Sequence, residues 1–403
     1  MQSVKILTAA AVIGAQLVAG QSSACRNDFT ITSVAQATNI PCATLEKDLI
    51  VDSTVSGNLV VEGITRIRGS FIITNASAIN QLSSTTLRTI DQEFHLEALT
   101  QIRGIQMPAL TDIGSIRWIH LPELNSIQLG QSGVTSATEV EISDTALSSL
   151  SEFKVSSVSI MKINNNDRLQ TYESTLANVT DELTFSSNGA DLVVSLPDLI
   201  WANNLGFTDV AEVNLPALQY INDSIRFDDS SLTSFSAPNL TTVEKGDLAF
   251  VANLELGNLT FPSLTQIGGS LTLINNTALE TVDGFPLLEE VGGAIRLGGN
   301  FQNVSLPALE RAAGDFVLAS TGDITDTCKT FESMEGDQIK GGFACRGDDD
   351  KANDENEVNT DGGSNGGGNG GSSNNDDSAA GTVSANMLAL VAAGAIGIFA
   401  QLL

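Results

Sequence analysis

Two pairs of adjacent acidic residues are the first candidates for catalysis in this sequence: Asp181 with Glu182, and Asp228 with Asp229. Enzymes that cleave polysaccharides place two carboxyl groups on one face, one as proton donor and the other as base or nucleophile. Adjacent residues of a strand point to opposite faces, so neither pair can act together from within a strand. A solvated turn explains both pairs better, and we expect no catalytic residue.

The sequence contains few residues that could support other kinds of catalysis. His95 and His120 are the only histidines, and the chain has neither a Gly-x-Ser-x-Gly motif nor the Gly-Gly-x-Gly-x-Asp repeat that binds Ca²⁺. Neither histidine lies near a cysteine in the sequence, which argues against a metal site. We therefore expect no cofactor and no bound metal.

Aromatic side chains could bind a sugar by stacking on its ring. The only Trp and Tyr residues are Trp118, Trp201, Tyr172 and Tyr220, and they are scattered along the chain. Packing in the core or at its edge is the expected role for such residues, and sugar stacking is the alternative.

Four cysteines form two pairs of equal spacing at opposite ends of the chain: Cys25 and Cys42, and Cys328 and Cys345. Of the three possible connectivities we favour a disulfide within each pair, because a repeat protein needs a cap at each open end. Between the first two cysteines, Ser33 is expected to cap a short helix that runs to Ile40.

Seven Asn-x-Ser/Thr motifs are potential N-glycosylation sites. They lie at Asn75, Asn178, Asn222, Asn239, Asn258, Asn275 and Asn303. Such motifs also arise by chance in a chain rich in Ser and Thr, so their number supports secretion without proving it. Any glycan would have to point outward from the fold.

These residues must be positioned by a repeat whose clearest copy is FPSLTQIGGSLTLINNTALETV, residues 261–282. Its general form is Pro-x-Leu-x-x-Ile/Val, a short spacer often ending in Gly, then two apolar residues separated by one position, then Asn. Eight of the nine prolines occupy the same place in their copies: Pro108, Pro122, Pro197, Pro216, Pro238, Pro262, Pro286 and Pro307. A short period of about 19 to 24 residues indicates a solenoid.

The repeat predicts one short strand per coil with one face turned inward. Leu271 and Leu273 alternate with polar neighbours, so Leu273 is expected inside and Thr272 outside. Asn follows the strand in many copies, where it suits the turn and its amide can bond to the amide of the next coil. These residues are Asn75, Asn165, Asn188, Asn253, Asn276 and Asn300. We expect one continuous domain over residues 21–345, with about a dozen coils.

Residues 1–20 have the form of a secretory signal peptide. Lys5 precedes an apolar run, and Ala19 and Gly20 supply the small residues near a cleavage site. Secretion agrees with the paired cysteines and with the glycosylation motifs. The alternative, a buried core helix, explains neither of them.

The sequence after Cys345 changes composition abruptly. Residues 346–378 are rich in Gly, Ser, Asn and acidic residues, so we expect a disordered stalk. Residues 379–403 end in a short apolar run with no basic flank, which fits a glycosylphosphatidylinositol (GPI) attachment signal better than a transmembrane helix. Ser378 is the favoured attachment residue and Asn375 the alternative. The net charge of −29 argues against nucleic acid as a partner.

Together, the Cys-bounded ends FTITSVAQATNIPC and CKTFESMEGDQIKGGFAC, the repeats and the tail resemble the fungal GPI-anchored cell-wall organisation proteins with receptor L-domain-like repeats. The resemblance covers essentially the whole chain. It implies an all-β fold, a right-handed parallel β-solenoid related to receptor L domains, displayed at the plasma membrane or the wall. It implies no catalytic residue.

Three functions remain open at this point. The first is a non-catalytic wall scaffold or adhesion module, which contacts wall polysaccharide or wall proteins and is held at the outer leaflet of the plasma membrane. The second is a carbohydrate-active β-helix enzyme. The third, a receptor-like binder of a secreted ligand, rests on the analogy of fold alone.

Overall fold

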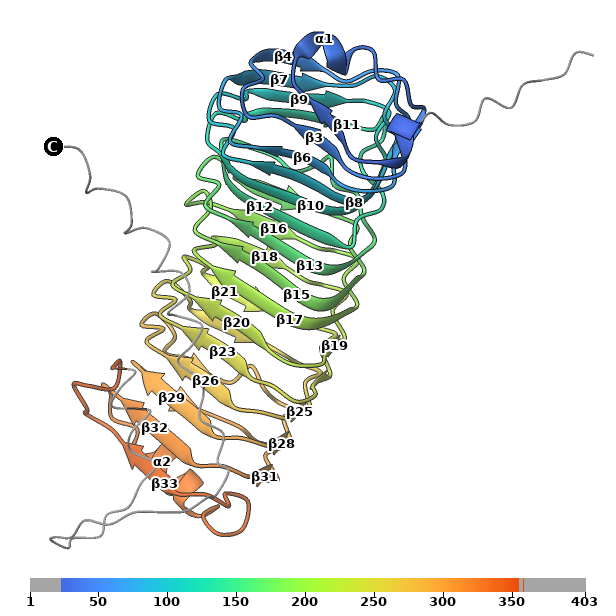
Figure 1. The fold of residues 1–403 in the computed structure, drawn as a ribbon. Helices are drawn as coiled ribbons and strands as arrows, with labels where there is room; N and C mark the ends of the chain where they lie inside the picture. The colour runs from blue at the N-terminus through green and yellow to red at the C-terminus, as the bar shows by residue number, and fades with distance from the viewer. Residues whose placement is uncertain (1–22, 355–357, 359–403) are drawn as a thin grey trace, which may run out of the picture. The chain divides into compact units, whose positions relative to one another are not determined.

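A computed structural model describes residues 23–354 and residue 358, and their backbone forms a parallel β-solenoid (Figure 1). Every strand pairing among these residues is parallel and joins one coil to the next. The predicted all-β solenoid is therefore confirmed. No helix in the described part of the chain is long and apolar enough to cross a membrane.

The longest face of each coil belongs to one sheet that runs from the first described coil to the last. Its strands are, in order, β1 (Phe29–Ile31), β3 (Leu49–Val51), β6 (Phe71–Thr74), β8 (Thr89–Glu97), β10 (Asp112–Leu121), β12 (Glu139–Thr145), β13 (Ser157–Asn164), β15 (Asn178–Ser186), β17 (Trp201–Thr208), β20 (Ile225–Asp228), β23 (Leu248–Val251), β26 (Leu271–Ile274), β29 (Ile295–Gly299), β32 (Phe316–Ser320) and β33 (Phe343–Arg346). We call the outer surface of this sheet the long face.

A second, shorter face precedes the long face within each coil. Its separate strands are β2 (Thr44–Leu45), β5 (Arg66–Ile67), β19 (Tyr220–Ile221), β22 (Thr242–Val243), β25 (Gln266–Ile267), β28 (Glu290–Val291) and β31 (Arg311–Ala312). In several middle coils the two faces merge into one bent strand. For example, β15 pairs with β17 at both ends, with a shift of register between Val179 and Glu182.

The third face consists of four smaller sheets stacked along the body. Their strands are β4 (Gly57–Val60), β7 (Ile79–Ser83), β9 (Gly104–Met107) and β11 (Ser126–Leu129), then β14 (Thr171–Glu173), β16 (Val193–Ser195) and β18 (Glu212–Asn214), then β21 (Ser234–Ser236) and β24 (Asn258–Thr260), and finally β27 (Thr281–Val282) and β30 (Asn303–Val304).

The repeated proline turns the chain between the third face and the second face. In the clearest copy, Leu264 N donates to Phe261 O at 3.3 Å across a turn that begins with Pro262. Proline suits the second position of such a turn because its ring fixes φ at the value that the turn needs and its missing N–H is not required. Phe261 and Leu264 are both buried. The Pro-x-Leu pattern therefore defines a corner with two inward anchors.

A second corner follows the long face, where the backbone adopts a left-handed conformation. Asn75, Asn165 and Asn275 have φ values of 56°, 54° and 57° there. Other coils place Ala98, His120, Asp144, Ser187, Asp209, Asp229 and Ala252 in the same conformation. Asn and Asp tolerate this conformation better than most residues.

A ladder of buried Asn side chains lies just beyond this corner. Asn253 Nδ2 donates to Phe227 O and to Asn276 Oδ1, both at 3.1 Å, and Asn253 Oδ1 accepts from Ser230 N at 3.0 Å. Asn166 and Asn188 repeat the arrangement, with Nδ2 to Oδ1 at 3.0 Å. The predicted amide bond from one coil to the next is therefore confirmed for Asn188, Asn253 and Asn276. It was wrong for Asn75 and Asn165, which lie at the left-handed corner itself, and for Asn300, whose amide donates to Thr277 O.

The core consists of side-chain rows that pass from coil to coil. Phe207, Phe227 and Phe250 stack in one row, with ring centroids 5.1 Å and 4.6 Å apart. Leu273 continues that row and is fully buried, whereas Thr272 is half-buried and faces outward. The predicted inward position of Leu273 is therefore confirmed.

The first end of the body is closed by a disulfide between Cys25 and Cys42, whose Cα atoms are 5.6 Å apart. A 3₁₀-helix, η1 (Ser23–Arg26), and a short helix, α1 (Val34–Ala37), accompany it. The predicted helix exists but ends earlier than Ile40. Ser33 stands at its N-cap without a side-chain hydrogen bond, and Gln36 Oε1 accepts from Thr32 N at 2.9 Å instead.

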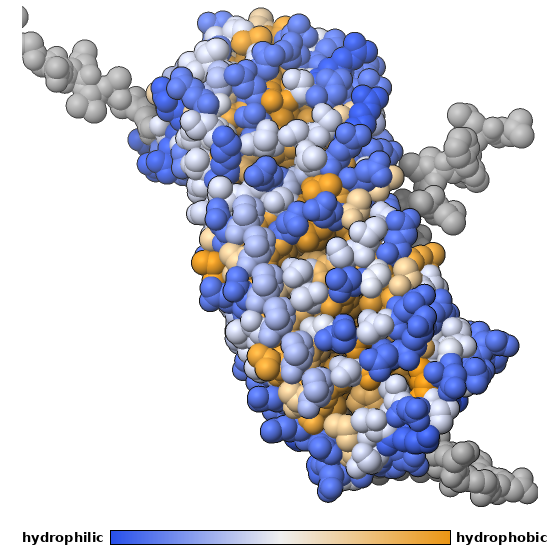
Figure 2. Space-filling model, turned by 180° about the vertical axis from the view of Figure 1, so that it is seen from behind, coloured by the Kyte–Doolittle hydropathy of each residue, from blue (hydrophilic) through white to orange (hydrophobic). Residues whose placement is uncertain are grey.

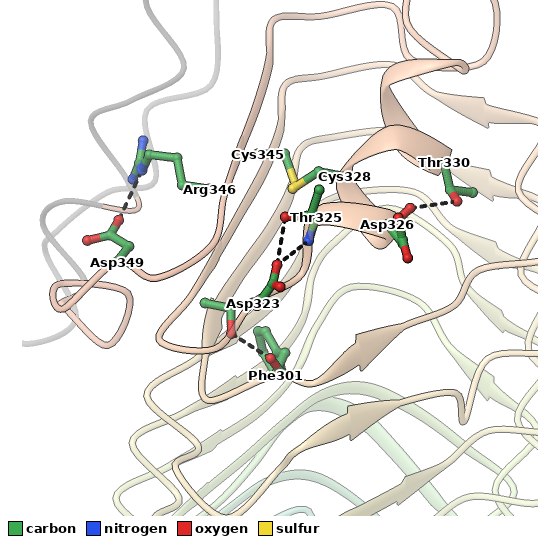
Figure 3. The surroundings of a disulfide bond; sticks show 10 residues. Phe301, Asp323, Thr325, Asp326, Cys328, Thr330, Cys345, Arg346 and Asp349 are labelled. Atoms are coloured by element: carbon green, nitrogen blue, oxygen red, sulfur yellow. Dashed lines mark hydrogen bonds and ion pairs between the residues drawn. A yellow bond between two sulfur atoms is a disulfide. The ribbon is translucent and has the colours of Figure 1, made fainter.

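The other end is closed by the disulfide between Cys328 and Cys345 (Figure 3). It joins helix α2 (Thr325–Glu332) to the last strand of the long sheet, where Cys345 pairs with Leu318. Asp323 Oδ1 accepts hydrogen bonds from Thr325 N and Oγ1 at the start of the helix. Both predicted disulfides are therefore confirmed, each at one end of the body.

The chain stays packed on the body beyond Cys345, further than its composition suggested. Asp349 N donates to Ser320 O at 3.0 Å, and Ala352 and Val358 are fully buried. They form an apolar cluster with Ile274, Val317 and Ala319 on the otherwise polar long face. Gly298 permits this contact, because a Cβ atom there would collide with Ala352 O. At least the first residues after Cys345 are therefore part of the folded body and not of a stalk.

Candidate interaction faces

The expected solvated turns were wrong for three of the four candidate carboxylates, because Asp181 and Glu182 lie within β15 and Asp228 is the last residue of β20. Only Asp229 lies in a turn, at the left-handed corner. The fold also separates the two pairs. Glu182 belongs to β15 and Asp228 to β20, with β17 between these two strands. Glu182 aligns with Asn204 near the start of the long-face segment, whereas Asp228 is the last residue of its strand. The two pairs therefore do not form one acid–base site.

Within each pair, the carboxylates have different neighbours. Glu182 forms an ion pair with Lys162 of the preceding coil at 2.7 Å, and Asp181 is exposed. Asp228 forms an ion pair with Arg226 on its own strand, while Asp229 occupies the left-handed corner. Glu182 and Asp228 are thus engaged by cations and not directed at a common point.

Burial raises the pKa of Asp228 above its ordinary value, although Arg226 opposes the shift. Its Oδ1 atom is buried and has no hydrogen-bond partner among the described residues. A perturbed carboxyl group can mark an active site, but ion-pair networks perturb pKa values as well. Here no second carboxylate pair faces Asp228, and burial of its own side chain accounts for the raised pKa without an active site.

Both histidines lie beside carboxylates on the outside of the body. His95 Nε2 is 3.0 Å from Glu97 and its Nδ1 is 3.5 Å from Glu93. His120 Nδ1 lies 2.5 Å from Asp144 Oδ2 of the next coil. No group of three His, Cys, Asp or Glu residues within residues 23–354 has the arrangement of a metal site.

Further ion pairs between coils lie on the long and second faces. Examples are Arg117 with Glu141 at 2.6 Å and Arg66 with Asp91 at 2.8 Å. Each exposed pair contributes only about 0–1 kcal/mol to stability. Their main effect is on recognition, because charges that are already paired offer little to a charged ligand.

The four Trp and Tyr residues divide into two buried and two accessible ones. Trp118 is fully buried against Phe94 and Phe153, and Tyr172 is buried with its pKa raised to about 12 by desolvation. Trp201 and Tyr220 are half-buried on the second face, and they are aligned neighbours on β17 and β19. They seemed scattered in the sequence, yet their separation along the chain equals one coil.

A shallow open pocket of about 350 Å³ lies on the same face toward the C-terminal end. Its lining is polar and comes from three successive coils: Thr265 and Gln266, Glu289 and Glu290, and Glu310 and Arg311. Arg311 and Glu290 form an ion pair there at 2.6 Å. No feature of the sequence pattern had marked this pocket, because it arises only when three coils are stacked.

The glycosylation motifs differ in how far their Asn side chains are exposed. Asn75, Asn178, Asn239, Asn258 and Asn303 are exposed, whereas Asn222 and Asn275 are half-buried. All seven therefore have some access to solvent, and use of these sites stays a prediction. The predicted signal peptide and the attachment residues Ser378 and Asn375 lie outside the described residues.

Most of the body's surface away from these residues is polar. Figure 2 shows polar residues over most of the side opposite to the view of Figure 1, with apolar residues in a broken band. The large apolar side chains that stand exposed in the described chain are Val34, Ile200, Leu254 and Leu287. Of these, Ile200 directly precedes Trp201 on the second face.

Comparison with known proteins gives several fungal relatives. The chain is 32% identical to "Protein ecm33" of Aspergillus fumigatus over 321 residues, which cover 79% of each protein. It is 29% identical to a "Cell surface GPI-anchored protein" of Arthroderma benhamiae over 85% of this chain and 91% of the relative. It is 32% identical to "Cell wall mannoprotein PST1" of Saccharomyces cerevisiae over 73% of this chain and 68% of the relative.

No family model and no solved structure matches the chain. The Aspergillus fumigatus relative, at 32% identity over 79% of this chain, nevertheless shows the family. The chain therefore belongs to the fungal family of Ecm33-like cell-surface and cell-wall proteins.

Proposed function

We propose that this protein is a GPI-anchored, N-glycosylated and non-catalytic contact module that helps to organise the fungal cell wall. The observation that carries the proposal is the separation of the candidate carboxylates on the solenoid. Glu182 and Asp228 lie on strands that are not neighbours, and each is paired with a cation. A long, ribbed and rigid surface suits contact with polymers or neighbouring proteins.

Anchoring is the second part of the proposal. Residues 379–403 are suited to attach the chain to a lipid, and the Gly-rich acidic residues before them are suited to extend the body from the surface. Attachment would confine the body near its ligands and raise its effective concentration there. The relatives named as cell-surface GPI-anchored and cell-wall proteins support this assignment.

Removing the candidate carboxylates from the anchored protein tests the non-catalytic part. We expect the fourfold variant Asp181→Asn, Glu182→Gln, Asp228→Asn and Asp229→Asn to restore wall resistance in cells that lack the protein. We also expect the purified wild-type chain to release no sugar from isolated wall glucan, mannan or chitin. Sugar release that the fourfold variant abolishes while still folded would establish an enzyme instead.

A further inference from the structure

Six outward side chains form one row along the second face, and Figure 1 shows four of the strands that carry it, β19, β25, β28 and β31, one after another along the body. Each residue is aligned with the next across neighbouring parallel strands. The row contains Trp201, Tyr220, Thr242, Gln266, Glu290 and Arg311. We call this set the outer row.

The direction of these side chains follows from the residues beside them. Ala202, Ile221 and Val243 each follow a member of the outer row and are fully buried. Since successive side chains of a strand alternate between faces, the members of the row point outward. Six rungs at a spacing of about 4.8 Å give the row a length of roughly 24 Å.

We propose that the outer row binds an extended, neutral polysaccharide, with Trp201 and Tyr220 as the stacking end and the pocket around Gln266, Glu290 and Arg311 as the polar end. This inference rests on the proposed contact with wall polymers and names the site of that contact. The class of ligand follows from the chemistry of the two ends of the outer row and from the negative charge of the pocket and of the whole chain.

The aromatic end offers a broad apolar surface with polar edges. Trp201 and Tyr220 are the only Trp and Tyr residues of the chain that are not buried, and they lie on adjacent rungs. Ile200 beside them is 46% exposed, which extends the apolar surface. Aromatic rings of this kind combine a large apolar contact area with a hydrogen-bonding edge, which suits the C–H face and the hydroxyl groups of a sugar ring.

The polar end offers hydrogen-bonding groups of several kinds. Gln266 has an amide that both donates and accepts, and Glu290 accepts. These groups line a shallow pocket of about 350 Å³ that is open to solvent. A sugar hydroxyl both donates and accepts, so such a mixed lining fits it.

The charge of the site excludes an anionic polymer. Three glutamates line the pocket, Glu289, Glu290 and Glu310, and its one arginine is already paired with Glu290 at 2.6 Å. The chain as a whole carries a net charge of −29. A phosphorylated or acidic polysaccharide would be repelled, whereas a neutral one would not.

The protein's own glycan is the competing occupant. Asn178 is exposed and aligned with Trp201 on the neighbouring rung, so a glycan on Asn178 would begin beside the indole ring. Such a glycan would occupy only the aromatic end, and it would leave the polar half of the row without a role. We therefore favour an external polymer, and the test below separates the two.

The test measures binding of the full-length chain, purified in detergent, to insoluble β-glucan and chitin, with an acidic polysaccharide as negative control. We expect the wild type to bind a neutral polymer, and Trp201→Ala with Tyr220→Ala to weaken binding by about tenfold or more, as expected for aromatic anchors. Leu254→Ala is the matched control, because Leu254 is 54% exposed and lies near the opposite end of the long face. It should bind like the wild type.

A second variant covers the case in which the double variant fails to fold. Gln266→Glu is nearly isosteric and replaces an amide donor by a further negative charge beside Glu290, so it should bind severalfold more weakly with an unchanged unfolding temperature. Binding by either folded variant equal to that of the wild type would overturn the proposed site and leave wall contact standing. Failure of the wild type to bind any wall polymer would overturn the proposed site together with contact to wall polymers, and would leave contact with neighbouring proteins as the proposed function.

The Asn178→Gln background distinguishes the protein's own glycan from an external polymer. We expect Asn178→Gln to bind at least as tightly as the wild type, and the Trp201 and Tyr220 substitutions to weaken binding in this background as well. If their effect disappeared once Asn178 was removed, the aromatic residues would serve the protein's own glycan and the proposal would be wrong.

Discussion

The buried Asn ladder gives the sharpest test of how the coils are held in register. Asn253 is fully buried, and replacing it with Ala removes three side-chain hydrogen bonds to two neighbouring coils. Asn276 Oδ1 keeps the backbone N–H of residue 253 as a donor, at 3.1 Å. Ser230 N and Phe227 O both lose the partner that Asn253 provides.

The expected cost follows from these two groups. A buried N–H left without its partner costs about 1–3 kcal/mol, whereas Phe227 O lies in the ladder between β20 and β23 and keeps a backbone donor there, so Asn253→Ala should lower the free energy of unfolding by about 1–3 kcal/mol. Asn253→Asp is a stricter variant, because it keeps the acceptor for Ser230 N but places an oxygen against Phe227 O and Asn276 Oδ1. We expect it to be at least as destabilising as the Ala variant.

Urea unfolding of the soluble chain ending at Asp377 measures these differences. Leu254→Ala is the control: it changes the next residue, which is 54% exposed, and should shift the free energy by less than about 0.5 kcal/mol. An Asn253→Ala variant as stable as this control would refute the reasoning. It would mean that water or backbone groups replace the ladder without loss.

Three further predictions concern the strand register, the disulfide at the C-terminal end of the body and the ionisation of Asp228. Leu273→Asp should abolish secretion because it buries an unpaired charge between coils, whereas Thr272→Asp on the outer side should be secreted; equal secretion of both would contradict the strand register. Cys328→Ser should lower the free energy of unfolding by about 3 kcal/mol, and an unchanged urea midpoint would show that the cap needs no disulfide. Asp228→Asn should be as stable as the wild type or more stable at pH 7. Because the pKa of Asp228 is raised in the folded state, its ionisation weakens folding as the pH rises above about 3.8, and the Asn variant should lack this decline.

The repeat could be predicted from the sequence because each position of its pattern has one physical cause. Pro262 and Leu264 mark a turn with a buried anchor, and Leu271 and Leu273 alternate with polar residues on one strand. Such local rules predicted the solenoid and the inward side of its long sheet. The equal spacing of the cysteines, together with the need to close both ends, predicted both disulfides.

The left-handed backbone conformation at the corner after the long face could be predicted only in part. Asn75 and Asn165 fit the expectation, but Ala98 and His120 adopt the same conformation although their residue types do not favour it. There the stacking of neighbouring coils fixes the backbone, and the local preference of the residue is overridden. A single sequence does not show at which positions the stacking of coils overrides the conformational preference of the residue.

The outer row was missed for a different reason. Trp201 and Tyr220 lie one coil apart, and the length of their own coil had to be known before they could be placed on adjacent rungs. The pocket around Gln266 likewise requires the alignment of three coils. Composition also misled at the C-terminal side, where acidic residues surround Ala352 and Val358, the two apolar residues that pack on the long face.

The central claim is that the protein acts by contact while held at the cell surface, and a complementation assay tests it most directly. In cells lacking the protein, resistance to a wall-stressing dye is compared for the full chain and for the chain ending at Asp377, which lacks Ser378 and the apolar tail. We predict that the shortened chain is secreted and folded but does not restore resistance, while the full chain does. Rescue by the shortened chain at a low secreted level would contradict the claim, because a contact module depends on confinement at the surface and a diffusing enzyme does not.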